Sequence, residues 1–279
     1  MAVRVIVGTQ FGDEGKGKMV DYFAQDADLV VRYQGGDNAG HTVVNEFGTF
    51  KLHIIPCGIF YENCSNLIGT GTVINPDQVI SEISDIKSKN NSLKFNNLFI
   101  SEKASVIMPY HKDIDAYYEN NSAVSIGTTK RGIGPAYSGK YFRSNLRIED
   151  LADLEYCKAK LEANLPLINA QLKFLGAKEY IVSELLEKCE IWYNELKPYI
   201  VNPNKFVNNF IKNNKNILFE GQLGLMKDID YGIYPYVTSS NTTASYAAVS
   251  GGFAANKISD VVGIAKAFVS AVGDGPFPT

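Results

Sequence analysis

The strongest constraint on the fold is a glycine-rich loop that follows a short apolar run near the start of the chain. Residues 3–7 have the length and composition of a buried strand, residues 8–18 contain four glycines, and residues 19–24 are predicted to form a short helix. A strand that leads through such a loop into a helix places main-chain N–H groups and a helix N-terminus around an anion. The segment therefore predicts a phosphate-binding loop. A glycine-rich turn with solvated charges is the weaker alternative.

The spacing within this loop is that of a P-loop with one departure. Gly12, Gly17 and Lys18 match the G-x-x-x-x-G-K pattern, but Met19 follows where a Ser or Thr would normally hold magnesium. A magnesium ion bound to a nucleotide still requires oxygen ligands. Asp13 can supply one of them from inside the loop, or can act as a base beside the bound phosphate.

The rest of the chain predicts an α/β fold with a mostly parallel central sheet and a helical insertion. Apolar runs at residues 29–33, 67–69 and 98–101 are expected strands, with a helix at about 76–87. Apolar residues then recur at helical spacing from 154 to 211, and Pro166 is expected to kink or split the first of these helices. We expect further strands at 217–220 and 261–268, separated by a long loop at 228–243. The expected organisation is a single nucleotide-binding domain over residues 1–279 with a mostly helical subdomain at about 150–213.

Three other polar segments are candidate ligand loops. Residues 32–42 follow the second expected strand and carry His41, which would lie at the carboxyl edge of the sheet and polarise a phosphoryl oxygen. A surface histidine without a role is the alternative. Residues 126–137, followed by Arg143, and residues 234–243 combine hydroxyl groups, glycines and arginines that suit a phosphate monoester. Either segment could also be a plain connector.

Composition excludes several classes of protein. The chain has 279 residues, a net charge of −3 and 45% hydrophobic residues, which disfavours a basic nucleic-acid-binding protein and a disordered chain. We expect no membrane segment and no signal peptide, since no apolar run approaches the ~18 residues that span a bilayer. The four cysteines lack metal-ligand spacing and are expected to be free thiols in a cytoplasmic protein.

Taken together, these motifs resemble adenylosuccinate synthetase along the whole chain. The matching strings, in the order of the family, are residues 12–18, 38–42, 127–129 with 131–137, 234–243 and 275–279. The resemblance implies a magnesium-dependent ligase of purine biosynthesis that uses GTP to join IMP to L-aspartate, giving adenylosuccinate, GDP and phosphate. The 6-oxygen of IMP would be phosphorylated first and then displaced by the amine of aspartate. A homodimer is also implied.

The resemblance also implies roles for individual residues. Asp13 would take the N1 proton of IMP and bind magnesium together with the Gly40 carbonyl, and His41 would be the general acid. The implied GTP contacts are Gly12, Asp13, Glu14, Gly15, Lys16, Gly17, Lys18, Gly40, His41 and Thr42. The implied IMP contacts are Asp13, Lys16, Asn38, Ala39, Gly40, His41, Thr129, Arg143, Thr238 and Val272, with Arg143 reaching the site of the other subunit.

The chain departs from the family pattern at positions that bear on chemistry. Phe11 replaces a tryptophan, and Ala271 stands where the family has an arginine. Leu223 stands where the family has a glutamine that contacts the 6-position of IMP, and Gln222 lies one place earlier. A leucine cannot donate a hydrogen bond, and the loss of one such donor can cost ~3 kcal/mol of transition-state stabilisation. The sequence leaves open whether Gln222 takes that place.

Family members continue beyond residue 279, and the continuation would carry aspartate and guanine recognition. The departures leave two further hypotheses. The chain could be a nucleotide-binding relative that is inactive or acts on another purine monophosphate, such as GMP or dGMP. A general P-loop phosphotransferase or GTPase switch is the last alternative, and it does not explain the polar loops around His41 and Thr238.

Overall fold

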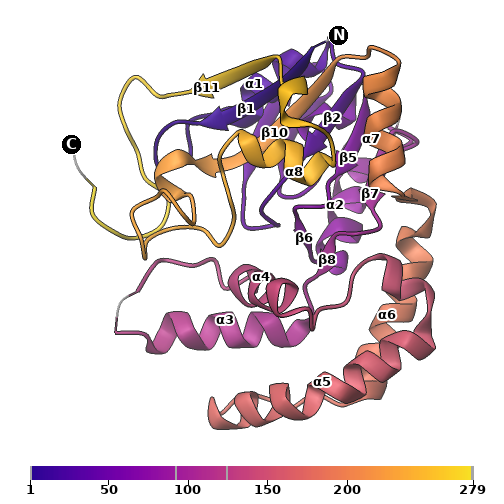
Figure 1. The fold of residues 1–279 in the computed structure, drawn as a ribbon, viewed down its shortest axis with the longest axis vertical. Coiled ribbons are helices and arrows are strands. Elements are labelled where there is room, and N and C mark those ends of the chain that lie inside the picture. Colours follow the sequence, from indigo (N-terminus) through magenta and orange to yellow (C-terminus); the bar gives the residue numbers. More distant parts are fainter. Residues whose placement is uncertain (1, 92, 124, 278–279) are drawn as a thin grey trace.

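The computed structural model describes residues 2–91, 93–123 and 125–277, and these residues form a mixed α/β fold (Figure 1). The last two residues of the 275–279 string lie outside them. The strands are β1 (Val3–Gly8), β2 (Leu29–Arg32), β3 (His41–Asn45), β4 (Gly48–Leu52), β5 (Ser65–Ile68), β6 (Val73–Ile74), β7 (Leu98–Ser101), β8 (Ser105–Val106), β9 (Ile200–Val201), β10 (Ile217–Gly224) and β11 (Asp260–Ile264). The helices are α1 (Lys16–Ala24), α2 (Pro76–Lys89), α3 (Pro109–Asn121), α4 (Ile133–Phe142), α5 (Leu154–Phe174), α6 (Val182–Leu196), α7 (Pro203–Lys212) and α8 (Ser245–Gly251).

The central sheet confirms the predicted fold class. Its strand order is β11–β1–β10–β2–β5–β7–β9, and every pairing within it is parallel. The late strand β10 is inserted between the two earliest strands, β1 and β2. Segments that are about 200 residues apart in the sequence therefore leave the sheet side by side.

Alternating side chains divide the core between the two faces of the sheet. Ile6, Val30 and Ile68 belong to a large core that also takes in α1, α2 and the β3–β4 hairpin. Val5 and Phe219 point the other way and pack with residues of α7 and α8. Successive residues of a strand face opposite sides of a sheet, so both sides of this one are covered by apolar groups.

The helical middle of the chain extends the larger core away from the sheet. In Figure 1, α3, α4 and α5 lie below the sheet, and α6 runs back toward it. Buried side chains of α5 and α6, including Leu161, Leu172 and Trp192, belong to the same apolar cluster as the sheet residues. The indole N–H of Trp192 also donates to the Asp77 carboxylate at the start of α2, at 2.6 Å.

Two sequence-based expectations about elements were wrong in part. Pro166 does not split helix α5, because the buried Leu161, Leu165 and Leu172 hold its apolar face in the core on both sides of the proline. Strand β11 ends at Ile264 rather than at residue 268, since its single partner, β1, ends at Gly8 opposite Ile264. The four cysteines are free thiols, as expected. No helix formed by the described residues is long and apolar enough to cross a membrane.

Candidate phosphoryl-transfer site

The site lies at the carboxyl edge of the sheet, where the segments that follow four neighbouring strands meet. The loop after β1 is the predicted phosphate loop, and the loop after β2 leads to His41. The segment after β10 begins at Leu225, and the segment after β11 carries Lys266 and Val272. Parallel α/β sheets bind ligands at such an edge, where the strand order reverses. The inserted position of β10 therefore brings four polar loops together.

The phosphate loop is held in shape by its own acidic residue. Glu14 is buried and accepts hydrogen bonds from the main-chain N–H groups of Gln10, at 3.1 Å, and Gly12, at 2.9 Å. It also forms an ion pair with Lys16, the first residue of α1. Gly15 precedes the helix with φ at +89°, a conformation that favours glycine. Glu14 thus shapes the loop from within.

A first hollow, which we term the phosphate hollow, opens beside the N-terminus of α1. It is lined by Asp13, Gly15, Lys16, Gly17, Lys18, Asn38, Ala39, Gly40, His41, Thr42, Leu223 and Val272. The helix N-terminus and two lysines make this hollow suited to an anion. Of the residues expected to contact GTP, Gly12 and Glu14 are outside the described lining. Their contact with a nucleotide stays a prediction.

Asp13 is the exposed carboxylate of this hollow. Its side chain is 68% exposed and forms an ion pair with Lys266 at 3.0 Å. Lys266 also donates to the Ser270 hydroxyl at 2.7 Å. The Asp13 carboxylate and the Gly40 carbonyl are both hard oxygen donors, which is the donor type that magnesium prefers. This donor set fits a magnesium ion whose remaining ligands are phosphate oxygens and water.

His41 is fixed by a buried network of charges behind the hollow. Its Nδ1 lies 2.7 Å from Glu220 Oε1, and the same oxygen accepts from Arg32 Nη1 at 2.9 Å. The other carboxylate oxygen of Glu220 accepts from the Cys57 main-chain N–H at 2.9 Å. Because Glu220 holds Nδ1, Nε2 is the ring nitrogen left for the hollow.

The pKa values of this network follow from burial and pairing. Burial raises the pKa of Glu220, but the hydrogen bond from His41 and the charge of Arg32 outweigh it and bring the pKa to about 2. Burial lowers the pKa of His41, as does the charge of Arg32, while Glu220 opposes both. Glu220 is therefore ionised, and the lowered pKa of His41 favours the neutral form of its ring.

The same network is the one cluster in the described residues whose histidine, cysteine and acidic groups lie close enough to hold a metal ion. The ligand atoms of His41, Cys57 and Glu220 lie within 4.8 Å of one another. Glu220 Oε1 already accepts from Arg32, and the positive charge of Arg32 opposes a second cation. We interpret the cluster as a hydrogen-bonded support for His41.

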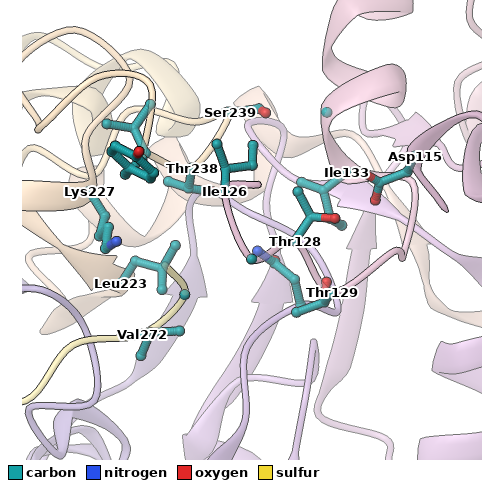
Figure 2. Close-up of a pocket in the computed structure, with 16 residues that line it drawn as sticks. Asp115, Ile126, Thr128, Thr129, Ile133, Leu223, Lys227, Thr238, Ser239 and Val272 are labelled. Atoms are coloured by element: carbon teal, nitrogen blue, oxygen red, sulfur yellow. The ribbon is translucent and has the colours of Figure 1, made fainter. Parts of the chain in front are cut away.

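A second hollow adjoins the first, and we term it the acceptor hollow. Figure 2 shows hydroxyl groups of Thr128 and Thr129 on one side of it, with Leu223, Val272 and Lys227 on the other. Its lining is completed by Asn38, Asp115, Ile126, Gly127, Ile133, Gly134, Tyr236, Val237, Thr238, Ser239 and Gly273. Hydroxyl groups and loop N–H groups on one side, with the apolar Leu223 and Val272 beside Lys227 on the other, suit a molecule that carries both a phosphate and a ring.

The two hollows share a partition made of Asn38, Leu223 and Val272. Gln222 does not take the place of Leu223. Its Oε1 accepts from the Gly36 N–H at 3.1 Å, and its Nε2 donates to Asn38 Oδ1 at 2.5 Å. With Oδ1 of Asn38 occupied in this way, its Nδ2 is available to a ligand. Gln222 thus orients Asn38 from behind the partition.

The structure brings most of the predicted site residues together and leaves one apart. Arg143 is exposed at the end of α4 with φ at +68°, and it is outside the described lining of both hollows. No role was predicted from the sequence for Arg32, Glu220 or Lys227. The signal for the first two was present, since a charged residue ends or interrupts an otherwise apolar strand. Nothing in the sequence showed that these charges would meet His41.

Comparisons with known proteins give one consistent result. The family model of adenylosuccinate synthetase matches residues 5–279. Adenylosuccinate synthetase 1 of Methanosarcina acetivorans is 58% identical over 279 residues, covering 100% of this chain and 65% of that protein. Adenylosuccinate synthetase of Clostridium perfringens is 44% identical over 280 residues, with 100% and 65% covered. The chain therefore spans about 65% of the length of these curated relatives.

Solved structures agree on the fold. The fully ligated adenylosuccinate synthetase from Plasmodium falciparum superimposes with a TM-score of 0.89 at 36% identity, over 99% of this chain and 64% of that one. The cyanophage S-2L succinoaminodeoxyadenylate synthetase bound to dGMP and dATP gives a TM-score of 0.64 at 20% identity, with 94% and 63% covered. At that identity the cyanophage enzyme shares the fold alone with this chain.

Proposed function

We propose, from the premise that the chain belongs to the adenylosuccinate synthetase family, that it forms the phosphoryl-transfer part of a ligase joining IMP to L-aspartate at the expense of GTP. The observation that carries the proposal is the pair of adjoining hollows. One is built from a helix N-terminus and lysines and the other from hydroxyl groups, and they share the partition of Asn38, Leu223 and Val272. A donor triphosphate and an acceptor nucleotide placed in these hollows would meet at the partition.

The phosphate hollow would receive GTP. The phosphates would lie at the positive N-terminal end of α1, where main-chain N–H groups are provided by Gly15, Gly17 and Lys18. The ammonium of Lys16 would add a positive charge there. Burial lowers the pKa of Lys16, although the charge of Glu14 opposes this shift. An anionic phosphate beside Lys16 would favour its charged form. Gly40, His41 and Thr42 also line this hollow.

Asp13 and His41 would perform the proton steps. Asp13 takes the N1 proton of IMP, the 6-oxygen forms a bond to the γ-phosphorus of GTP, and GDP leaves with the electron pair of the broken bond. The amine of aspartate then bonds to C6 and loses a proton, while phosphate departs with the C6–O bonding pair. The negative charge of the triphosphate would return His41 to its protonated form, with Nδ1–H held by Glu220 and Nε2–H donated to a phosphoryl oxygen.

Asp13 and the Gly40 carbonyl would hold magnesium between the loops that follow β1 and β2. A bound magnesium ion supplies charge neutralisation at the phosphoryl group. Asp13 must then exchange its ion pair with Lys266 for the metal and the substrate. Lys266 would in turn be free to approach the transferred phosphate.

The acceptor hollow would receive IMP. Thr129 can donate a hydrogen bond to its phosphate, while Thr238 and Nδ2 of Asn38 can contact the rest of the nucleotide and Val272 can pack against its purine. Arg143, which is exposed and lies outside the lining of both hollows of its own chain, would reach the phosphate in the other subunit of a homodimer. Selection of guanine and binding of aspartate would involve the portion of the relatives that this chain does not span.

The proposal is tested on the full-length protein with GTP, Mg²⁺, L-aspartate and IMP labelled with ¹⁸O at the 6-position. We expect adenylosuccinate to form and the label to appear in the released phosphate, because the 6-oxygen leaves with the phosphoryl group. The D13A variant should lose turnover. Phosphate release that does not depend on IMP would contradict the proposal, and so would faster turnover with GMP or dGMP, which would indicate a different acceptor behind Leu223.

A further inference from the structure

Lys227 is a buried cation for which the phosphate loop and His41 provide no partner. It lies in the short 3-10 turn Leu225–Lys227 that follows β10, the residue is 5% exposed, and it lines the acceptor hollow. Its Nζ donates to the main-chain oxygen of Asp274 at 3.2 Å. Its own carbonyl accepts from the N–H of Thr238 at 2.8 Å, which fixes it beside a predicted IMP contact.

The described residues leave the Lys227 ammonium with spare donor capacity. An ammonium has three N–H donors, and this one has a single carbonyl acceptor within the described part of the chain. The neighbouring carboxylate of Asp228 is committed elsewhere, since it accepts from the N–H groups of Asp230, Tyr231 and Thr242. Burial lowers the pKa of Lys227, and the charge of Asp274 opposes that shift. Leaving N–H donors of a buried ammonium unpaired is costly, and a ligand that enters the hollow can supply the missing acceptors.

Lys227 is the cation among the residues that line the acceptor hollow. The other charged lining residue, Asp115, accepts from the N–H of Gly132 at 2.8 Å and so supports the loop before α4. In Figure 2, Lys227 lies next to Leu223, across the hollow from Thr128 and Thr129. If the phosphate of a nucleotide is bound at Thr128 and Thr129, its base extends toward the partition and Lys227.

We propose that Lys227 donates a hydrogen bond to the 6-oxygen of the acceptor purine and stabilises the negative charge that develops there when N1 loses its proton. This inference rests on the proposed function. Leu223 closes the same end of the hollow and cannot donate a hydrogen bond, so the charge must be met by another group. A flexible ammonium in an enclosed setting is suited to that role.

The role sets the class of ligand that Lys227 recognises. A 6-oxopurine presents an acceptor to the ammonium, whereas a 6-aminopurine presents a donor that would leave both groups unpaired. A purine with hydrogen at C6 makes neither interaction. The three classes of nucleoside monophosphate therefore separate a contact at the 6-position from a contact with the phosphate or ribose.

Calorimetry on the full-length protein tests this assignment with IMP and with purine ribonucleoside monophosphate, which lacks the 6-oxygen. We expect the wild-type protein to bind IMP at least 10-fold more tightly than the 6-unsubstituted nucleotide. We expect K227M to lose about 10- to 100-fold in affinity for IMP, the range of a hydrogen bond to a charged group, and to change little toward the other ligand. K227R should keep most of the preference. K257M, at an exposed lysine, is the matched control.

An equal loss for both ligands in K227M would overturn the inference, because it would place Lys227 on the phosphate or in a structural role. Equal affinity of the wild-type protein for the two ligands would also overturn it, even if K227M did not fold. A turnover assay separates failure of this inference from failure of the proposed function. A wild-type protein that binds IMP with the expected preference but forms no adenylosuccinate would contradict the proposed function alone.

Discussion

Glu220 Oε1 lies 2.7 Å from His41 Nδ1, although 179 positions separate the two residues in the sequence. The contact exists because β10, which carries Glu220, pairs with β2 just before the loop that leads to His41. A buried carboxylate at this position fixes which ring nitrogen carries the first proton. It also stabilises the imidazolium that a general acid requires.

Replacing Glu220 with Gln should lower kcat by about 10²-fold, which is the lower end of the contribution of a general acid. The carboxamide keeps the size of the side chain but cannot balance a charged imidazole. We expect the KM values for GTP and IMP to change only a few-fold, because neither substrate touches Glu220. Steady-state kinetics of the full-length protein with each substrate varied in turn checks this.

The matched control for this prediction is E190Q, at an exposed glutamate on α6. It should leave kcat and thermal stability unchanged. E220Q should also lower the unfolding temperature, because Arg32 loses a buried counterion. An unchanged kcat in a folded E220Q protein would show that His41 does not depend on the charge behind it.

Replacing Gly17 with Ala should impair the site without removing a functional group. A Cβ at Gly17 would lie 2.9 Å from His41 Cβ, closer than real Cβ contacts come. The start of α1 and the start of β3 must therefore move apart, although alanine is the better helix former. We expect kcat to fall at least 10-fold, the cost of a displaced catalytic group, with the helical circular dichroism retained.

Gly176 is the contrast for that substitution. It follows α5 with φ at +69°, and nothing lies within 4 Å of a Cβ built there. G176A should cost about 1 kcal/mol of stability through backbone strain and leave kcat unchanged. Equal activity of G17A and G176A would show that the spacing between Gly17 and His41 does not limit catalysis.

The sequence predicts local elements well where apolar periodicity is strong and unambiguous. The buried strand β1 and the helix α2 both emerge within two residues of the expected bounds. The β3–β4 hairpin was not predicted, because residues 41–52 follow a glycine-rich loop and their alternation is short. At Pro166 the sequence favoured a break that does not occur, because burial of Leu161, Leu165 and Leu172 outweighs the helix-breaking tendency of proline.

The sequence predicted the separate motifs of the site but not how they lie relative to one another. The phosphate loop and the His41 loop could be identified because each follows an early strand. The position of β10 between β1 and β2 is set by long-range pairing, which hydrophobic patterns do not encode. That pairing alone brings Glu220 behind His41 and places Leu223 and Lys227 beside the acceptor hollow.

Glu82 gives the fold a measurable pH dependence. Its carboxylate is buried on α2 and accepts from the N–H groups of His53, Ile54 and Ile55, which follow β4. Burial raises the pKa of Glu82 to about 7 against these hydrogen bonds, from an ordinary value of 4.5. Because the folded protein holds this proton more tightly than the unfolded chain, the contribution is present in full below pH 4.5. It is lost as the pH rises through about 7.

Urea unfolding at pH 5 and pH 8 measures this contribution by comparison with E82Q. The wild-type protein should lose up to about 3 kcal/mol more stability than E82Q between the two pH values, at about 1.4 kcal/mol per pKa unit. The contributions of all other titrating groups cancel in the comparison, because both proteins contain them. The same pH dependence in both proteins would mean that the three N–H donors fully offset the burial of the carboxylate.

Replacing Pro166 with Ala should stabilise the protein. Pro166 is exposed in the interior of α5, where it cannot donate to the carbonyl of residue 162. An alanine restores that hydrogen bond and is a better helix former, so we expect a gain of about 1–3 kcal/mol in the free energy of unfolding. Pro203 is the contrast, because it occupies the first turn of α7, where its missing N–H costs nothing. Urea unfolding of P166A and P203A should show a gain for P166A alone. A lower free energy of unfolding in P166A would mean that Pro166 favours the backbone conformation in which α5 packs on the core.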